Sequence, residues 1–148
     1  MKWFSLLLAF SAGAVLPLQA GINSHLRNYS GSPLIAAFIS FLVGTLVLFA
    51  LTFVLRVPWP SPSALSQAPW WAWTGGALGA YLVFLIIVLA ERLGAAVMVA
   101  LIITGQMFVS LLLDHYALLG FPRHPLNAAR IIGTALLLSG VFLIRYKS

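Results

Sequence analysis

The chain has almost no acidic residues and no cysteine. Only Glu91 and Asp114 carry negative charge, and charged residues of both signs fill 7% of the 148 positions. A soluble domain needs roughly a quarter of its residues charged to cover its surface. The absence of cysteine excludes disulfides, thiolate catalysis and cysteine-bound metal. This composition excludes a soluble globular protein and indicates that lipid is the solvent.

Hydrophobic residues make up 62% of the chain and fall into long runs. A helix needs about 20 mostly apolar residues to cross the hydrocarbon core of a bilayer. The runs predict an all-α, polytopic transmembrane helical bundle that forms a single transmembrane domain over residues 1–148. Its five predicted helices are 3–21, 34–55, 70–90, 94–120 and 127–146.

The segments between the runs carry most of the basic residues. Residues 22–32 are polar and turn-rich, and the prolines of residues 57–69 exclude regular helix. Leu18 stands where a signal-peptide cleavage site needs a small residue, so we expect the first run to be a retained helix. A net charge of +6 would indicate nucleic acid in a soluble protein. Single Lys and Arg residues at the ends of apolar runs instead indicate membrane lipids, and no nucleic acid, as partners.

Polar side chains of the first predicted helix lie along one stripe. Ser11, Gln19 and Asn23 are spaced eight and four residues apart, which places them on one face. Pro17 cannot donate a hydrogen bond to the carbonyl of Gly13. A freed carbonyl beside a polar stripe suits a hinge or a small-molecule site. The alternative is that Gln19 and Asn23 only hydrogen-bond a neighbouring helix.

A second stripe lies on the fourth predicted helix. Gln106, Ser110 and Asp114 follow one another at four-residue steps and share a face. A carboxylate inside the bilayer is a functional candidate, because it can exchange a proton during a reaction cycle. The alternative is an interfacial aspartate paired with His115 or Arg123.

Glu91 is the second candidate for proton exchange. It lies at a helix junction beside Arg92, and a headgroup-level pair of these two residues is the alternative. The chain contains no HExxH motif, no phosphate-binding loop and no nucleophile elbow. We therefore expect no enzymatic activity, no metal and no cofactor.

Several short motifs occur in a fixed order in the last two predicted helices. They are Leu93-Gly94-Ala95-Ala96, Gly105-Gln106, Leu113-Asp114-His115, Arg130-Ile131-Ile132-Gly133 and Leu138-Ser139-Gly140-Val141. The set resembles the drug/metabolite transporter superfamily, which includes the small multidrug resistance transporters. Together with Pro17-Leu18-Gln19-Ala20-Gly21-Ile22-Asn23, it looks most like the YdcZ-type inner-membrane exporters, over nearly the whole chain.

The resemblance implies a half-size transporter unit that exports a small metabolite or drug-like molecule across a bacterial inner membrane. Five helices form a thin wall around a substrate, so we expect a homodimer with a site between the first and fourth helices. Small multidrug resistance proteins hold a glutamate in their first helix, whereas residues 3–22 contain no acid. The resemblance therefore implies two alternative substrate classes. One is a cationic drug, and the other is a neutral or anionic substrate held by Gln19, Asn23 and Gln106. A non-transporting accessory subunit and a lipid-carrier flippase are the alternative functions.

Basic residues give the five-helix bundle no preferred orientation. The side that holds the N-terminus carries Lys2, Arg56, Arg123 and Arg130. The opposite side carries Arg27, Arg92, Arg145 and Lys147. Four minus four leaves no bias, whereas a fixed topology needs an excess on the cytoplasmic side. Placing Arg130 within the membrane would give three against four and favour a cytoplasmic C-terminus. An unbiased chain can insert both ways, so we predict dual topology and an antiparallel homodimer.

Overall fold

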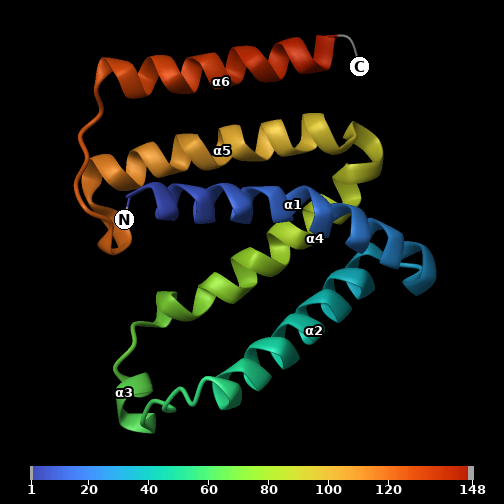
Figure 1. Cartoon of the computed structure of the whole chain (residues 1–148), viewed down its shortest axis with the longest axis vertical. Coiled ribbons are helices and arrows are strands. Elements are labelled where there is room, and N and C mark those ends of the chain that lie inside the picture. Colours follow the sequence, from blue (N-terminus) through green and yellow to red (C-terminus); the bar gives the residue numbers. More distant parts are fainter. Residues whose placement is uncertain (1, 147–148) are drawn as a thin grey trace. The chain divides into compact units, whose positions relative to one another are not determined.

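The structure is a computed structural model, and it describes residues 2–146 (Figure 1). All regular structure in this part of the chain is helical, which confirms the predicted all-α class. The elements are α1 (Lys2–Ser30), α2 (Pro33–Val54), α3 (Pro62–Ser66), η1 (Trp70–Thr74), α4 (Gly75–Leu93), α5 (Ala95–Tyr116), η2 (Leu118–Gly120) and α6 (Ala128–Tyr146).

Five helical segments of the described chain are long and apolar enough to cross a membrane. They are Trp3–Ser30, Pro33–Val54, Trp70–Leu93, Ala95–Tyr116 and Ala128–Tyr146. Most of their large hydrophobic side chains are exposed, including Trp3, Phe10 and Phe142. An apolar surface of this extent needs lipid around it, because water would drive it to aggregate.

The first helix is longer than predicted. The sequence placed its end at Gly21, but α1 continues to Ser30. Residues 22–30 contain no proline and no glycine, so nothing in the backbone forces the helix to stop. It ends where Gly31 takes a positive φ of 71° and donates a hydrogen bond to the Arg27 carbonyl at 2.8 Å. Pro33 then begins α2 at its first helical position.

The fourth predicted helix, 94–120, is too long at its C-terminal end. α5 ends at Tyr116, because Ala117 is left-handed at φ 54° and Leu119 has φ 55°. The amide of His124 donates to the carbonyl of Asp114 at 2.9 Å, and this bond occupies one of the last-turn carbonyls that a longer helix would use.

The prolines between α2 and α4 do not exclude helix entirely. Pro62 begins the short helix α3, because the first helical position needs no amide hydrogen. The Ser61 hydroxyl accepts a hydrogen bond from the Ala64 amide at 3.2 Å and caps this helix.

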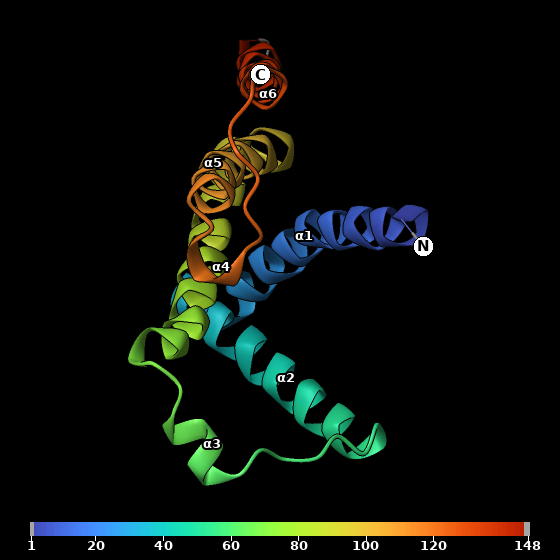
Figure 2. The same cartoon turned by 90° about the vertical axis from the view of Figure 1, so that its left-hand side faces the viewer.

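The chain divides into two compact units, residues 1–92 and 93–148. In the first unit, α2 and α4 meet near the α1–α2 turn and diverge toward the linker that carries α3 (Figures 1 and 2). Their meeting point is a buried cluster of Ala36, Ala37, Val83 and Ile87.

The second unit is an antiparallel hairpin of α5 and α6 (Figure 1). The buried residues of these two helices are Val97, Met98, Thr104 and Leu111 on α5, and Thr134 and Val141 on α6. Both threonines return their hydroxyl groups to their own helix: Thr104 donates to the Ala100 carbonyl at 2.8 Å and Thr134 to the Arg130 carbonyl at 2.9 Å. The hairpin therefore presents apolar surface along most of its length.

Candidate functional site

Near the C-terminal end of α1, one polar group of the stripe and one beside it are buried without a hydrogen-bond partner. Asn23 is only 4% exposed, and its side-chain nitrogen makes no hydrogen bond. The hydroxyl of the neighbouring Ser24 is also buried without a partner. Each unsatisfied buried polar group costs about 1–3 kcal/mol. Two neighbouring polar groups that each carry this cost are candidates for ligand binding.

The other predicted residues of α1 differ from Asn23. Gln19, one turn earlier on the stripe, is exposed and free to meet a ligand or a second surface. The Ser11 hydroxyl donates to the Leu8 carbonyl at 2.8 Å, so its hydrogen is already used. Pro17 is half-buried within an α1 that continues through it as helix.

Glu91 pairs with Arg27, at 2.5 Å between Oε2 and Nη1, and joins the end of α4 to α1. Its partner is therefore not Arg92, the alternative that the sequence offered. The two side chains are 46% and 33% exposed, and a pair this open contributes at most about 1 kcal/mol. Arg27 lies one turn beyond Asn23, so the α1 stripe runs from an amide into an ion pair.

Asp114 pairs with Arg130 at the start of α6. The sequence offered His115 or Arg123 as its partner, and neither is. The Arg130 guanidinium also donates to the His124 carbonyl at 2.7 Å, while the Asn127 side chain caps α6 by accepting from the Arg130 amide at 2.9 Å. The Asp114 carboxylate, 20% exposed, is therefore held within a network at one end of the hairpin.

Gln106 and Ser110, the remaining members of the α5 stripe, are exposed. Gln106 lies two residues from both Thr104 and Phe108, which places it about 200° around the helix from each. Those two residues line cavities between α5 and α6, and neither Gln106 nor Ser110 does. Gln106 and Ser110 are therefore exposed residues on the helix face whose third member, Asp114, pairs with Arg130 of α6.

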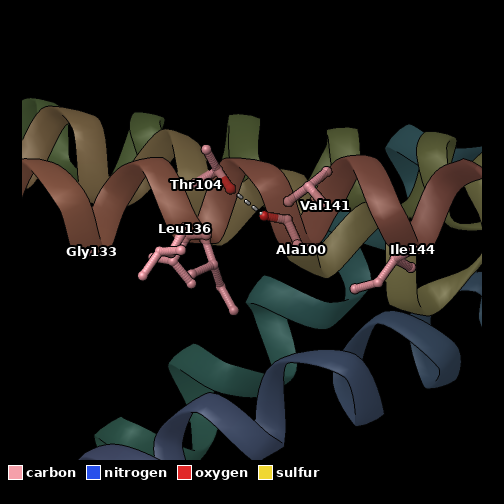
Figure 3. Close-up of a pocket in the computed structure, with 9 residues that line it drawn as sticks. Ala100, Thr104, Gly133, Leu136, Val141 and Ile144 are labelled. Carbon is pink, nitrogen blue, oxygen red and sulfur yellow. Dashed lines mark hydrogen bonds between the residues drawn. The ribbon is translucent and has the colours of Figure 1, made fainter.

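The hairpin itself contains an apolar cavity of about 350 Å³ (Figure 3). Ala100 and Thr104 line it from α5, and Gly133, Leu136 and Ile144 line it from α6. The hydrogen bond between the Thr104 hydroxyl and the Ala100 carbonyl removes its main polar group. This cavity suits hydrocarbon better than a polar substrate.

Sequence reasoning did not identify Ser24, nor Arg27 and Arg130 as the partners of the two acids. No short-range pattern gives these pairs, because 64 residues separate Arg27 from Glu91 and 16 separate Asp114 from Arg130. The available signal was the scarcity of acids. An unpaired carboxylate is costly in a membrane, and the chain has eight basic residues for only two carboxylates, so each acid is expected to pair with a basic residue.

Metal ligands do not gather in the described residues. No three His, Asp or Glu side chains between residues 2 and 146 are placed to hold a metal ion.

Comparison with known proteins gives one family. Residues 4–143 match the family model described as "Putative inner membrane exporter, YdcZ". The chain is 30% identical over 146 residues to the inner membrane protein YdcZ of Escherichia coli strain K12, and the alignment covers 97% of each chain. No solved structure matches the chain.

Proposed function

The chain belongs to the YdcZ-type family of the drug/metabolite transporter superfamily, and from this membership we propose that it is a secondary transporter exporting a small molecule. It is a multi-pass protein of the inner membrane. We assign it transport rather than catalysis. In this proposal the two compact units act together as one transmembrane domain.

The buried and unpartnered amide of Asn23 carries the proposal. A donor without a partner is costly in hydrocarbon, where no water can replace the missing bond. A substrate that accepts a hydrogen bond would remove this cost on binding. Gln19 lies one turn away on the same face, and with Ser11 it extends the stripe along α1.

The substrate class follows from the chemistry of this stripe. The side-chain nitrogen of Asn23 and the hydroxyl of Ser24 are donors, and Arg27 lies one turn farther on. No carboxylate lies on α1. The stripe therefore favours a ligand with acceptor oxygens, neutral or anionic, over a cationic drug. We also propose Gln106 and Ser110, both exposed on α5, as substrate-binding residues.

Coupling to protons would run through the two acids. Protonation of Asp114 or Glu91 would break its pair with an arginine and free one end of a helix. Asp114 is the stronger candidate, because it is the less exposed of the two and belongs to the α5 stripe. Pro17 would serve as the hinge of α1.

The working unit that we propose is an antiparallel homodimer. Each membrane side carries four basic residues and one acid, since Asp114 lies on the side of Arg130 and Glu91 on the side of Arg27. The net charge is therefore +3 on each side, so counting the acids together with the basic residues still gives no preferred orientation. Two opposed copies would then form the inverted repeat that alternating access uses.

Solid-supported-membrane electrophysiology on reconstituted protein tests the proposal. Metabolite classes with carboxylate, phosphate, amide or amine groups are applied at two pH values. We expect transient currents with acceptor-rich solutes and none with protein-free vesicles. Absence of current and of radiolabelled solute uptake for every class would favour a non-transporting subunit.

A further inference from the structure

Two cavities of opposite character meet at the start of α6. The first, which we call the apolar groove, has a volume of about 300 Å³ and is lined by Leu111 on α5 and by Ile131, Thr134, Ala135 and Leu138 on α6, among others. The second, the polar pocket, has a volume of about 390 Å³ and is lined by His124, Pro125, Asn127 and Arg130.

The same short segment of chain lines both cavities. Leu126 lines the apolar groove, and its two neighbours in the sequence line the polar pocket. Likewise, Arg130 lines the polar pocket and the next residue, Ile131, lines the apolar groove. Consecutive Cα atoms are 3.8 Å apart, so groups in the two cavities are within reach of one small amphiphile. Along α6, Arg130 is one turn before Thr134 and two turns before Leu138, so the helix face that lines the groove carries a guanidinium at its first turn.

The only hydroxyl group that lines the apolar groove, that of Thr134, already donates its hydrogen within α6. Thr134 donates to the Arg130 carbonyl at 2.9 Å, and the other lining side chains are hydrocarbon. Its volume is about ten times the share of one liquid water molecule, enough for a stretch of acyl chain.

The polar pocket attracts an anion. The guanidinium of Arg130 has five N–H donors, and the structure gives bonds from Nη1 to the His124 carbonyl and from Nη2 to Asp114. Three donors remain, on a side chain that is 30% exposed. Arg123 adds a second positive charge on the same loop, so two arginines and one acid leave a net +1 there. The N-terminus of α6 contributes further positive potential.

The side chains of a second copy offer no free carboxylate for this pocket. Among side chains the chain has only two carboxylates, and both are already paired with arginines of their own unit. The abundant anions at the end of a membrane helix are lipid phosphates.

We propose that this end of the α5–α6 hairpin is a binding site for an anionic phospholipid. The phosphate accepts hydrogen bonds from Arg130 in the polar pocket, and one acyl chain lies in the apolar groove along Thr134, Ala135 and Leu138. The site lies within one compact unit and does not depend on the proposed transport activity.

Native mass spectrometry tests this proposal on the full chain reconstituted in nanodiscs of equal parts phosphatidylglycerol and phosphatidylcholine. We expect wild-type protein to retain one phosphatidylglycerol in preference to phosphatidylcholine. Arg130→Gln should lower that preference about tenfold, as loss of one charge-assisted hydrogen bond predicts. Arg145→Gln, which removes the same charge at the far end of α6, should leave it unchanged.

The groove is tested separately, because Arg130→Gln also removes the partner of Asp114 and so affects folding as well as lipid binding. Ala135→Phe fills the groove without touching the ion pair, and it should lower lipid retention, whereas Ala50→Phe on the exposed face of α2 should not. Equal retention of the two lipids by wild type would overturn the proposal. So would unchanged retention in Ala135→Phe, or displacement of the lipid by inorganic phosphate, which would indicate a soluble-anion site.

Discussion

Asp114 and Glu91 each meet one arginine, yet their surroundings differ. Asp114 is 20% exposed within a network of Arg130, His124 and Asn127, whereas Glu91 is 46% exposed beside Arg27 alone. If Asp114 loses its charge, it releases Arg130 at the start of α6, whose guanidinium also binds the His124 carbonyl. Glu91 releases only one contact between two helix ends.

This difference predicts that proton coupling depends on Asp114. Asp114→Asn cannot bind or release a proton, so the pH dependence of transport should disappear while substrate binding persists. Transport currents measured across an imposed pH gradient give the readout. Glu91→Gln serves as the matched control and should keep the pH response.

A wild-type pH response in Asp114→Asn would contradict this assignment. Glu91 would then be the next residue to carry protons, and a uniporter without proton coupling the next mechanism.

Helical spacing predicts which residues of a stripe share a helix face, but it does not predict which residues form hydrogen bonds or ion pairs with them. The four-residue steps of Gln106, Ser110 and Asp114 define a face from sequence alone. The contact of Asp114 with Arg130 depends on where α5 stops and how residues 117–127 return, which no periodic pattern encodes. The unpartnered amide of Asn23 likewise emerges only when burial is known.

The length of each apolar run determines where this chain forms a membrane-spanning helix, whereas the backbone conformation of single residues determines where each helix ends. The five apolar runs predicted all five spans, because a membrane requires about 20 apolar residues in each. The ends were less predictable. α1 passes through a polar segment that looked like a loop, since polarity alone does not stop a helix, and the left-handed Ala117 that ends α5 carries no sequence signature.

The junction of α4 and α5 gives a test of this view. Gly94 has φ 72°, and no atom outside its own neighbourhood lies within 4 Å of the position that a Cβ would take. Its ψ of 161° completes a backbone conformation that essentially only glycine adopts, so Gly94→Ala should destabilise the protein by about 1–3 kcal/mol through backbone strain alone. Reversible unfolding in mixed detergent micelles measures the change.

Gly105→Ala is the matched control for that measurement. Gly105 lies inside α5 with equally open space but without a positive φ. Alanine there should stabilise the helix by about 0.5–1 kcal/mol. Equal effects at both positions would mean that the Gly94 conformation does not decide this helix end.

At the scale of the whole molecule, the even distribution of charge predicts two orientations in the membrane. Single cysteines introduced by Ser30→Cys and Ser148→Cys, the second outside the described residues, can be labelled in intact cells with an impermeant reagent. Roughly half labelling at both positions is the expected result, because neither side holds an excess of basic residues. Full labelling at one position and none at the other would establish a fixed topology and exclude the antiparallel homodimer.

The central claim is that a small molecule crosses the membrane along the α1 stripe. The most direct test compares Gln19→Leu with Gln67→Leu, the same substitution at an exposed position after α3. Both variants are reconstituted at equal density, and their transport currents are measured with a solute that wild type moves. We predict that Gln19→Leu abolishes the current while folding and membrane insertion stay intact, and that Gln67→Leu transports at the wild-type rate. A wild-type rate in Gln19→Leu would contradict the claim.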